Sequence, residues 1–299
     1  MSSRPQSGSL GKAAVRPHPA ELPKPAPVVH PHAAKRNGAS RPPEGDLLRC
    51  LRRYGIRRPA QLERILQAAS VAGVGRQITD RDVEILQWVG RHGHVTVSQV
   101  ARRWFKRDGV ADAGSTAAPR RLRILQTLGL LHRETEWFAD RERLYRLTED
   151  GAALAGARDQ SAEPFRLGPA NLVLAEIGHS LALVDLTEQL LDQHPGATLT
   201  TERELRVMRR KDLQAGARRA GQGGRIADAV LHLADGDDVA IELDYTNKRA
   251  ADYLRIIGEY KQESYKHIWW YVSELRVPML RRIVAADRWA ERRIEVGVW

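Results

Sequence analysis

A hairpin signal in the second half of the chain constrains its fold more than any other feature. Residues 225–233 and 239–245 are apolar runs of strand length, and the turn sequence Ala234-Asp235-Gly236-Asp237 separates them. Helical and strand patterns alternate around this hairpin. We predict helices at 169–193, 248–265 and 278–290, and strands at 197–201, 267–273 and 292–298. Residues 169–299 are therefore expected to form a mixed α/β domain with a central sheet and flanking helices.

Three acidic residues interrupt the two apolar strands of this hairpin. Glu242 and Asp244 are two residues apart, so their side chains point to one face of the sheet, and Asp228 on the neighbouring strand could converge with them. Carboxylates that share a cleft repel each other unless a cation or protons join them. Oxygen ligands of this kind favour Mg²⁺ or Mn²⁺, which can activate water for phosphodiester hydrolysis. The alternative is that the acids are solvated groups at strand ends.

The segment 78–155 has the element order of a winged helix-turn-helix. Thr79, Thr96 and then Ser115 or Thr116 are the expected N-caps of three helices. Gly93 ends the first helix, and Gly129 ends the third. Strands at 130–137 and 142–147 then flank a turn at 139–141, the expected wing, and Thr148 caps a short final helix.

Arginine is concentrated in this segment where a winged helix would meet DNA. The third helix enters the major groove in such a fold, and no acid occurs from 115 to 128. Arginine is the side chain best suited to guanine edges. We expect base contacts from Arg120, Arg121 and Arg123, phosphate contacts from Arg102, Arg103 and Lys106, and wing contacts from Arg141 and Arg143. The alternative is a winged helix that binds a protein.

A second basic cluster lies at 206–224, which we predict to be a flexible, glycine-rich loop. Its cations are Arg206, Arg209, Arg210, Lys211, Arg218 and Arg219. A mobile basic loop beside a carboxylate cleft could close over a phosphate backbone. A disordered connection without a ligand is the alternative.

The charge of the whole chain agrees with a nucleic-acid partner. Its 299 residues include 48 Lys and Arg against 37 Asp and Glu, a formal net charge of +11. Nine of the fifteen prolines fall in residues 1–44, which predicts a disordered basic tail; 45–77 is expected to be a short helical extension and 156–168 a linker. A single cysteine, Cys50, suits a reducing cytoplasm, and no segment has the pattern of a membrane span or a signal peptide.

The acidic hairpin resembles the restriction-endonuclease-like superfamily, whose pattern is Pro-Asp, a hairpin, and then Asp/Glu-x-Lys. Residues 78–299 as a whole resemble the replication-relaxation family of actinobacterial plasmids and mobile elements, in which a winged helix precedes such a domain. The matching residues are Asp228 within 226–230, the run at 241–246, and the following helix that ends in Glu259-Tyr260, with weaker support from 201–205.

Two departures from the nuclease pattern affect what this resemblance implies. Ala227 replaces the proline, and Asp244 replaces the lysine that normally orients water. Lys248, at the start of the next helix, could reach back as a substitute, and Lys261 is a more distant one. The catalytic candidates are thus Asp228, Glu242, Asp244 and Lys248, and the metal ligands would be the three acids.

The resemblance implies a protein that binds double-stranded DNA of a plasmid or mobile element, in replication, its control or transfer. The second domain would hold DNA without cutting it, or would bind a second copy or a replication or transfer protein. Two other functions remain open at this point, a Mg²⁺-dependent endonuclease targeted by the winged helix and a dimeric transcriptional repressor.

Overall fold

The computed structural model describes residues 60, 64, 78–107, 110–111, 116–134, 142–156, 170–171, 174–216, 224–246 and 248–299. The predicted tail at 1–44, nearly all of the helical extension at 45–77 and the linker lie outside this part of the chain. The wing turn at 139–141 lies outside it too, as do Arg141, Arg218 and Arg219. No helix in the described part is both long enough and apolar enough to cross a membrane.

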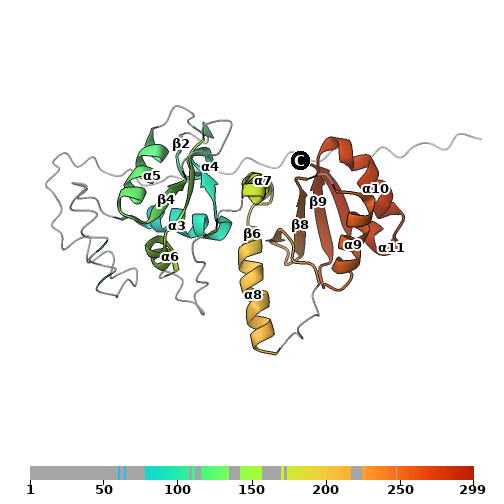
Figure 1. Ribbon diagram of the computed structural model, residues 1–299. Helices are drawn as coiled ribbons and strands as arrows, with labels where there is room; N and C mark the ends of the chain where they lie inside the picture. The colour runs from blue at the N-terminus through green and yellow to red at the C-terminus, as the bar shows by residue number, and fades with distance from the viewer. Residues whose placement is uncertain are drawn as a thin grey trace, which may run out of the picture. The chain divides into compact units, whose positions relative to one another are not determined.

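The first half of the described chain is a cluster of helices with a small sheet (Figure 1). Its helices are α3 (Asp80–His92), α4 (Val97–Trp104), α5 (Ala117–Thr127) and α6 (Glu149–Gly156). Its strands are β1 (Val95–Thr96), β2 (Lys106–Arg107), β3 (Val110–Ala111), β4 (Leu131–Glu134) and β5 (Leu144–Leu147). The sequence did not predict β1, which pairs with β5 to give a three-stranded sheet in the order β1-β5-β4, nor the small β2-β3 pair.

Capping residues fix the ends of these helices largely as predicted. The hydroxyl groups of Thr79 and Thr96 accept backbone N–H groups of the first turns of α3 and α4, and each is completed as a capping box. Gly93 and Gly129 end α3 and α5 with positive φ angles that only glycine adopts easily. Thr116 occupies the N-cap of α5 but makes no side-chain capping bond.

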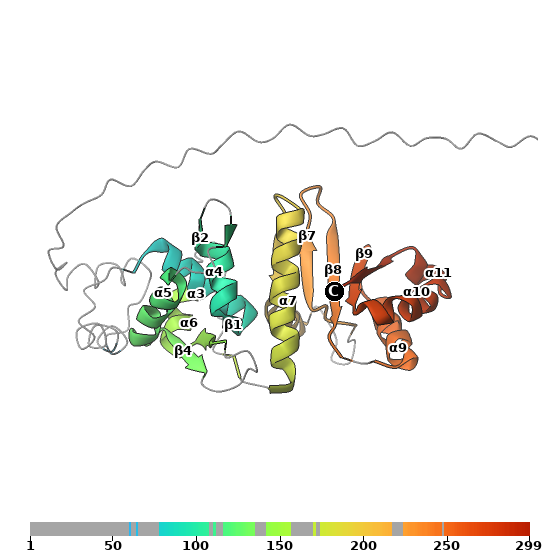
Figure 2. The same ribbon diagram turned by 90° about the horizontal axis from the view of Figure 1, so that it is seen from above.

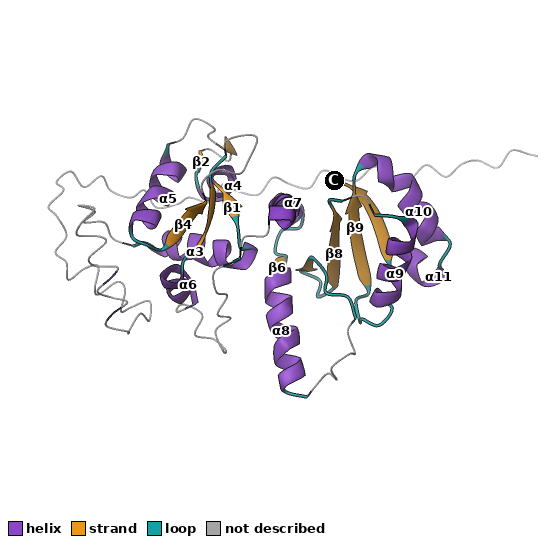
Figure 3. Ribbon diagram, in the orientation of Figure 1, coloured by secondary structure: helices purple, strands orange, loops and turns teal. Residues whose placement is uncertain are grey.

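The second half contains a five-stranded sheet between two layers of helix (Figures 2 and 3). Its strands are β6 (Thr198–Thr201), β7 (Ala229–His232), β8 (Asp238–Asp244), β9 (His267–Val272) and β10 (Ile294–Val298). Their order is β10-β9-β8-β7-β6, with β6, β7 and β8 antiparallel and β8, β9 and β10 parallel. This confirms the mixed α/β class and the predicted hairpin.

Different helices cover the two faces of this sheet. Helix α7 (Leu174–Gln193) packs on the face that carries Ile241 and Leu243. Helices α9 (Ala250–Tyr260), α10 (Val277–Ala285) and α11 (Arg288–Glu291) cover the opposite face, where Ala240 and Trp270 are buried. Helix α8 (Glu202–Gln214) has no buried residue and projects below the sheet in Figure 1, and η1 (Glu274–Arg276) precedes α10.

Two predictions about this half were wrong. Residues 202–214 form α8 instead of a flexible loop, because Thr201 and Glu204 make a capping box and no glycine follows until Gly216. The predicted helix at 278–290 is divided into α10 and α11, because the Asp287 carboxylate accepts the backbone N–H groups of Trp289 and Ala290 and starts a new helix there.

Candidate nucleic-acid interface and carboxylate sites

Helix α5 exposes two of the three arginines that the sequence placed at a DNA surface. Arg120 and Arg123 are one turn apart and both exposed. Neither guanidinium has a hydrogen-bond or ion-pair partner among the described residues. No acidic side chain lies in α5, so nothing on the helix itself neutralises this pair. The two arginines therefore present uncompensated positive charge on one helix face.

Arg121 has a different environment from its two neighbours. Its guanidinium donates two hydrogen bonds to the carboxylate of Asp82 on α3, which is 1% exposed. Asp82 also accepts the backbone N–H of Thr79 at 2.6 Å, as part of the cap of α3. The prediction of a base contact from Arg121 is not supported in this conformation. Its observed bonds fasten α5 to the start of α3.

The phosphate-binding candidates on α4 are also engaged. Arg102 is hydrogen-bonded to Asp185 of α7, and Arg103 to Glu188, which also accepts the indole N–H of Trp88 at 3.0 Å. Arg143 is half-buried, and the side chain of Lys106 lies outside the described part of the structure. In the observed conformation, the guanidinium groups of Arg102 and Arg103 are therefore bonded to carboxylates of α7.

The arginines of α8 are mostly bonded within the protein. Arg209 donates to the backbone oxygens of Gly224 and Arg225 at 2.6 and 3.1 Å, and to Glu263 at 2.7 Å. Arg206 pairs with Glu202 one turn earlier. Arg210 is exposed, whereas Lys211 is half-buried. The basic cluster therefore offers less available charge than its sequence suggests.

Glu242 is a buried acid on the α9 face of the sheet, ion-paired with the partly exposed Arg225. Arg225 donates two hydrogen bonds to its carboxylate at 2.8 and 2.9 Å, and the Tyr260 hydroxyl donates a third. The side chain is 1% exposed. Burial and the nearby charge of Asp228 raise the pKa of Glu242 to about 7, against the opposing effect of Arg225.

Asp244 is the acid to which the predicted lysine reaches back. The Lys248 ammonium donates to its carboxylate at 2.7 Å, and the Tyr253 hydroxyl donates from α9. Burial and this hydrogen bond to Asp244 raise the pKa of Tyr253 well above its ordinary range, so the phenol stays protonated. Asp244 thus has a cation and a neutral donor of its own.

Asp228 is bonded toward α7 instead. Its carboxylate accepts the backbone N–H of Leu243 at 2.8 Å and lies 3.3 Å from His179 Nε2. Burial acts to lower the pKa of His179, but the hydrogen bond and charge of Asp228 outweigh it, and the pKa is raised. His179 is therefore more readily protonated than a free imidazole, and its Nε2 is the nitrogen partner of Asp228.

These three arrangements do not fit a shared divalent metal. Glu242 and Asp244 do point to one face, as predicted, but each carboxylate is bonded to its own cation and tyrosine. Among the described residues, no group of three His, Cys, Asp or Glu side chains is placed to hold a metal ion. The predicted site with Asp228, Glu242 and Asp244 as joint ligands is thus not seen in the described part of the chain, because each acid is bonded to other side chains of the protein.

Sequence reasoning suggested Lys248 but missed the other groups that bond to these acids. Arg225 lies three residues before Asp228, and His179 lies far away on α7. Tyr253 and Tyr260 are seven residues apart, a spacing that places both on one face of the helix after β8. That spacing is the signal that could have identified them.

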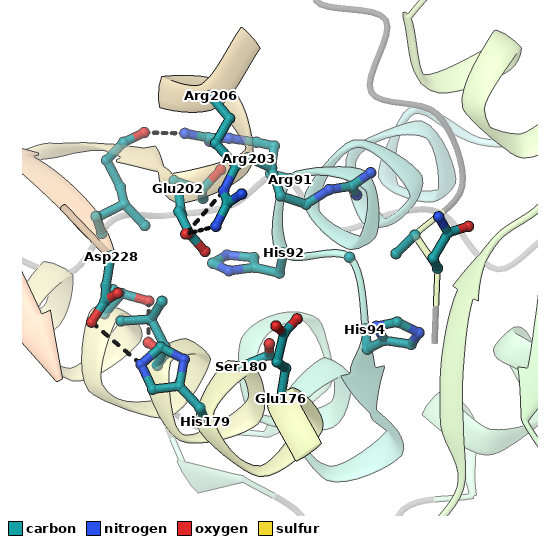
Figure 4. A pocket seen from close by; sticks show the side chains of 18 of the residues that line it. Arg91, His92, His94, Glu176, His179, Ser180, Glu202, Arg203, Arg206 and Asp228 are labelled. Atoms are coloured by element: carbon teal, nitrogen blue, oxygen red, sulfur yellow. Dashed lines mark hydrogen bonds and ion pairs between the residues drawn. The ribbon is translucent and has the colours of Figure 1, made fainter. Parts of the chain in front are cut away.

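A pocket of about 480 Å³ opens beside His179 and Asp228 (Figure 4). Its polar lining includes Arg91, His92, His94, Glu176, His179, Glu202, Arg203, Arg206, Arg210 and Asp228. Burial lowers the pKa of His92 to about 3 and that of His94 to about 4, so both imidazoles are neutral at pH 7. The arginines and acids that line the pocket are largely bonded to other groups of the protein, as Arg206 is to Glu202.

Comparison with known proteins gives one match. The family model described as replication-relaxation matches residues 86–275, which is more than half of the chain and spans both halves of the described structure. The comparisons with curated proteins and with solved structures gave no match.

Proposed function

Because this chain belongs to the replication-relaxation family, we propose that it binds the DNA of a plasmid or other mobile element and acts in replication, its control or transfer. The family membership supports the process. Support for DNA as the partner comes from the side chains of α5. In this proposal residues 78–155 are a winged helix-turn-helix in which α4 and α5 form the helix-turn-helix and β4 and β5 the wing.

The observation that carries the proposal is the exposed pair Arg120 and Arg123. A guanidinium can donate two parallel hydrogen bonds to O6 and N7 of guanine in the major groove. Residues early in the second helix of a helix-turn-helix reach base edges, and Arg120 lies in the first turn of α5. The bond between Arg121 and Asp82 then fixes the orientation of α5.

The C-terminal sheet domain contributes binding rather than cleavage in this proposal. Each acid of the nuclease-like pattern has a nitrogen partner within the protein: His179 for Asp228, Arg225 for Glu242 and Lys248 for Asp244. Since the residues do not fit a metal, no hydrolytic step is assigned to them. The domain would hold DNA next to the site chosen by α5, or bind a protein partner.

The test is a double variant, Arg120→Ala with Arg123→Ala, on a duplex that the wild-type protein selects from a random-sequence pool. Each lost bidentate base contact costs about 1–3 kcal/mol, so affinity should fall at least tenfold. The matched control is Arg282→Ala with Arg288→Ala, which removes two exposed arginines from α10 and α11. Unchanged affinity in the α5 variant, or equal losses in both variants, would refute the assignment.

An endonuclease is the second candidate, favoured by the approach of Lys248 to Asp244. It is tested with supercoiled DNA in Mg²⁺ or Mn²⁺. We expect no nicking above a buffer control. Nicking that disappears in a Glu242→Gln variant would establish the enzyme and replace the proposal of a purely binding domain.

A further inference from the structure

Two large aromatic side chains lie in contact on the surface, beyond the carboxyl ends of the parallel strands. Tyr245 follows β8 and Trp299 follows β10, with ring centroids 5.3 Å apart. They are 47% and 44% exposed. We propose that this aromatic pair is a binding site for single-stranded DNA, on which unpaired bases stack. The proposal rests on the proposed function only in taking DNA as the partner.

The sheet brings the two rings together although they are far apart in the sequence. Asp244 of β8 is in register with Val272 of β9, which is in register with Val298 of β10. The Trp299 backbone N–H donates to the Val272 carbonyl oxygen at 3.0 Å and extends this alignment by one residue. The chain end marked C lies at the ends of β8 and β9 in Figures 1 and 2.

The position of Tyr245 is set by a glycine of α7. A Cβ atom at Gly178 would lie 2.9 Å from Cε1 of the Tyr245 ring, so the ring rests directly on the helix backbone there. Thr246 N–H and the Lys248 ammonium both donate to Asp244, which holds the chain that follows Tyr245. The aromatic surface is therefore preorganised, and little conformational freedom is lost when a base stacks on it.

The segment that leaves β8 carries basic residues within a few positions of Tyr245. The Arg249 side chain is 90% exposed, and among the described residues its ion-pair contact is a long one, 3.9 Å to Asp252. Arg276 donates to the Lys248 carbonyl oxygen at 2.8 Å and so fixes the segment next to η1, where Leu275 is 92% exposed. An exposed cation four residues after an exposed ring fits a strand whose phosphates and bases are both accessible.

The chemistry of the rings favours a single strand over a duplex. Bases inside a duplex have both faces covered by their neighbours, whereas an unpaired base offers a free face to an aromatic ring. Ring stacking tolerates every base, so this site would bind without strong sequence preference. It would complement α5, whose arginines suit base edges in a groove.

The experiment measures fluorescence anisotropy of a labelled oligothymidine and of the selected duplex with the full chain. Tyr245→Ala with Trp299→Ala should weaken oligothymidine binding at least tenfold and leave duplex binding nearly unchanged. Tyr245→Phe with Trp299→Phe keeps both rings and should retain most of the affinity. The control Met208→Ala with Leu213→Ala removes exposed apolar side chains from α8 and should change neither.

The outcomes separate this site from the proposed function. Loss of duplex binding in Arg120→Ala with Arg123→Ala, while oligothymidine binding persists, supports two distinct sites. The single-strand site is overturned if the wild-type protein does not bind oligothymidine, or if the alanine variant binds it as well as the wild type does. Neither result depends on whether α5 binds the duplex. A change of oligomeric state in the alanine variant without a change in oligothymidine binding would also overturn it, and would assign the rings to a protein contact.

Discussion

Helices α5 and α8 are both rich in arginine, and they differ in what those arginines bind. On α5, Arg120 and Arg123 are exposed on a helix without acids. Helix α8 begins with Glu202 and Glu204, and its residue Arg209 is bonded to Glu263. A cluster of positive charge in a sequence therefore does not measure the charge available to a ligand. The availability depends on acids in the same helix and on groups that only the fold brings close.

The largest expected effect separates the neighbours on α5. Arg121→Ala leaves the Asp82 carboxylate buried without its cation, and breaking such a pair costs about 3–5 kcal/mol of unfolding free energy. Arg120→Ala removes an exposed side chain and should change stability by less than about 0.5 kcal/mol. Chemical denaturation of both variants measures the difference. Equal stabilities would mean that the Arg121–Asp82 bond has no structural role and would reopen Arg121 as a DNA contact.

The next effect divides the arginines of α8 in the same way. Arg209→Ala removes a charged hydrogen bond to Glu263 and two to backbone oxygens, and should destabilise the protein by about 2 kcal/mol. Arg210→Ala should leave stability unchanged. If Arg210 contacts phosphate, its loss lowers the slope of log K against log salt by about one unit. Equal salt slopes for wild type and Arg210→Ala would exclude α8 from the DNA interface.

The features that the sequence predicted are those set by local chemistry. Thr79 and Thr96 cap helices because their hydroxyl groups bond to N–H groups three residues ahead. Glu242 and Asp244 share a face because side chains alternate along a strand. In both cases the groups concerned lie within a few residues of each other in the sequence, so the sequence pattern alone predicts their arrangement.

The features that could not be predicted depend on contacts across the fold. No spacing rule links Arg121 to Asp82, 39 residues earlier, or His179 to Asp228, 49 residues later. The same three acids would form a metal site or three separate ion pairs, according to whether Arg225, Lys248 and His179 reach them. The sequence showed the acids and suggested Lys248, but it did not show that each acid would have its own partner.

The smallest expected effect is the dependence of stability on pH, which tests whether His179 carries a positive charge beside Asp228. The pKa of His179 is raised in the folded protein by Asp228 and by the Leu243 carbonyl oxygen. A group with a raised folded pKa binds protons more tightly when folded, so its stabilisation is complete below its unfolded pKa, about 6.5, and is lost as pH rises through the folded value. Glu242 acts in the same direction, because its pKa is raised from about 4.5 to about 7. The Glu242 contribution should therefore be lost as pH rises from about 4.5 to about 7, and the His179 contribution as pH rises from about 6.5 through its raised folded pKa. Above pH 6.5, denaturation of a His179→Gln variant should show a shallower fall in stability than the wild type. A Glu242→Gln control reports the contribution of the carboxyl group separately.

If wild type and His179→Gln show the same pH dependence, His179 does not carry the charge that balances Asp228, and the acid would again be available for a cation from outside the protein.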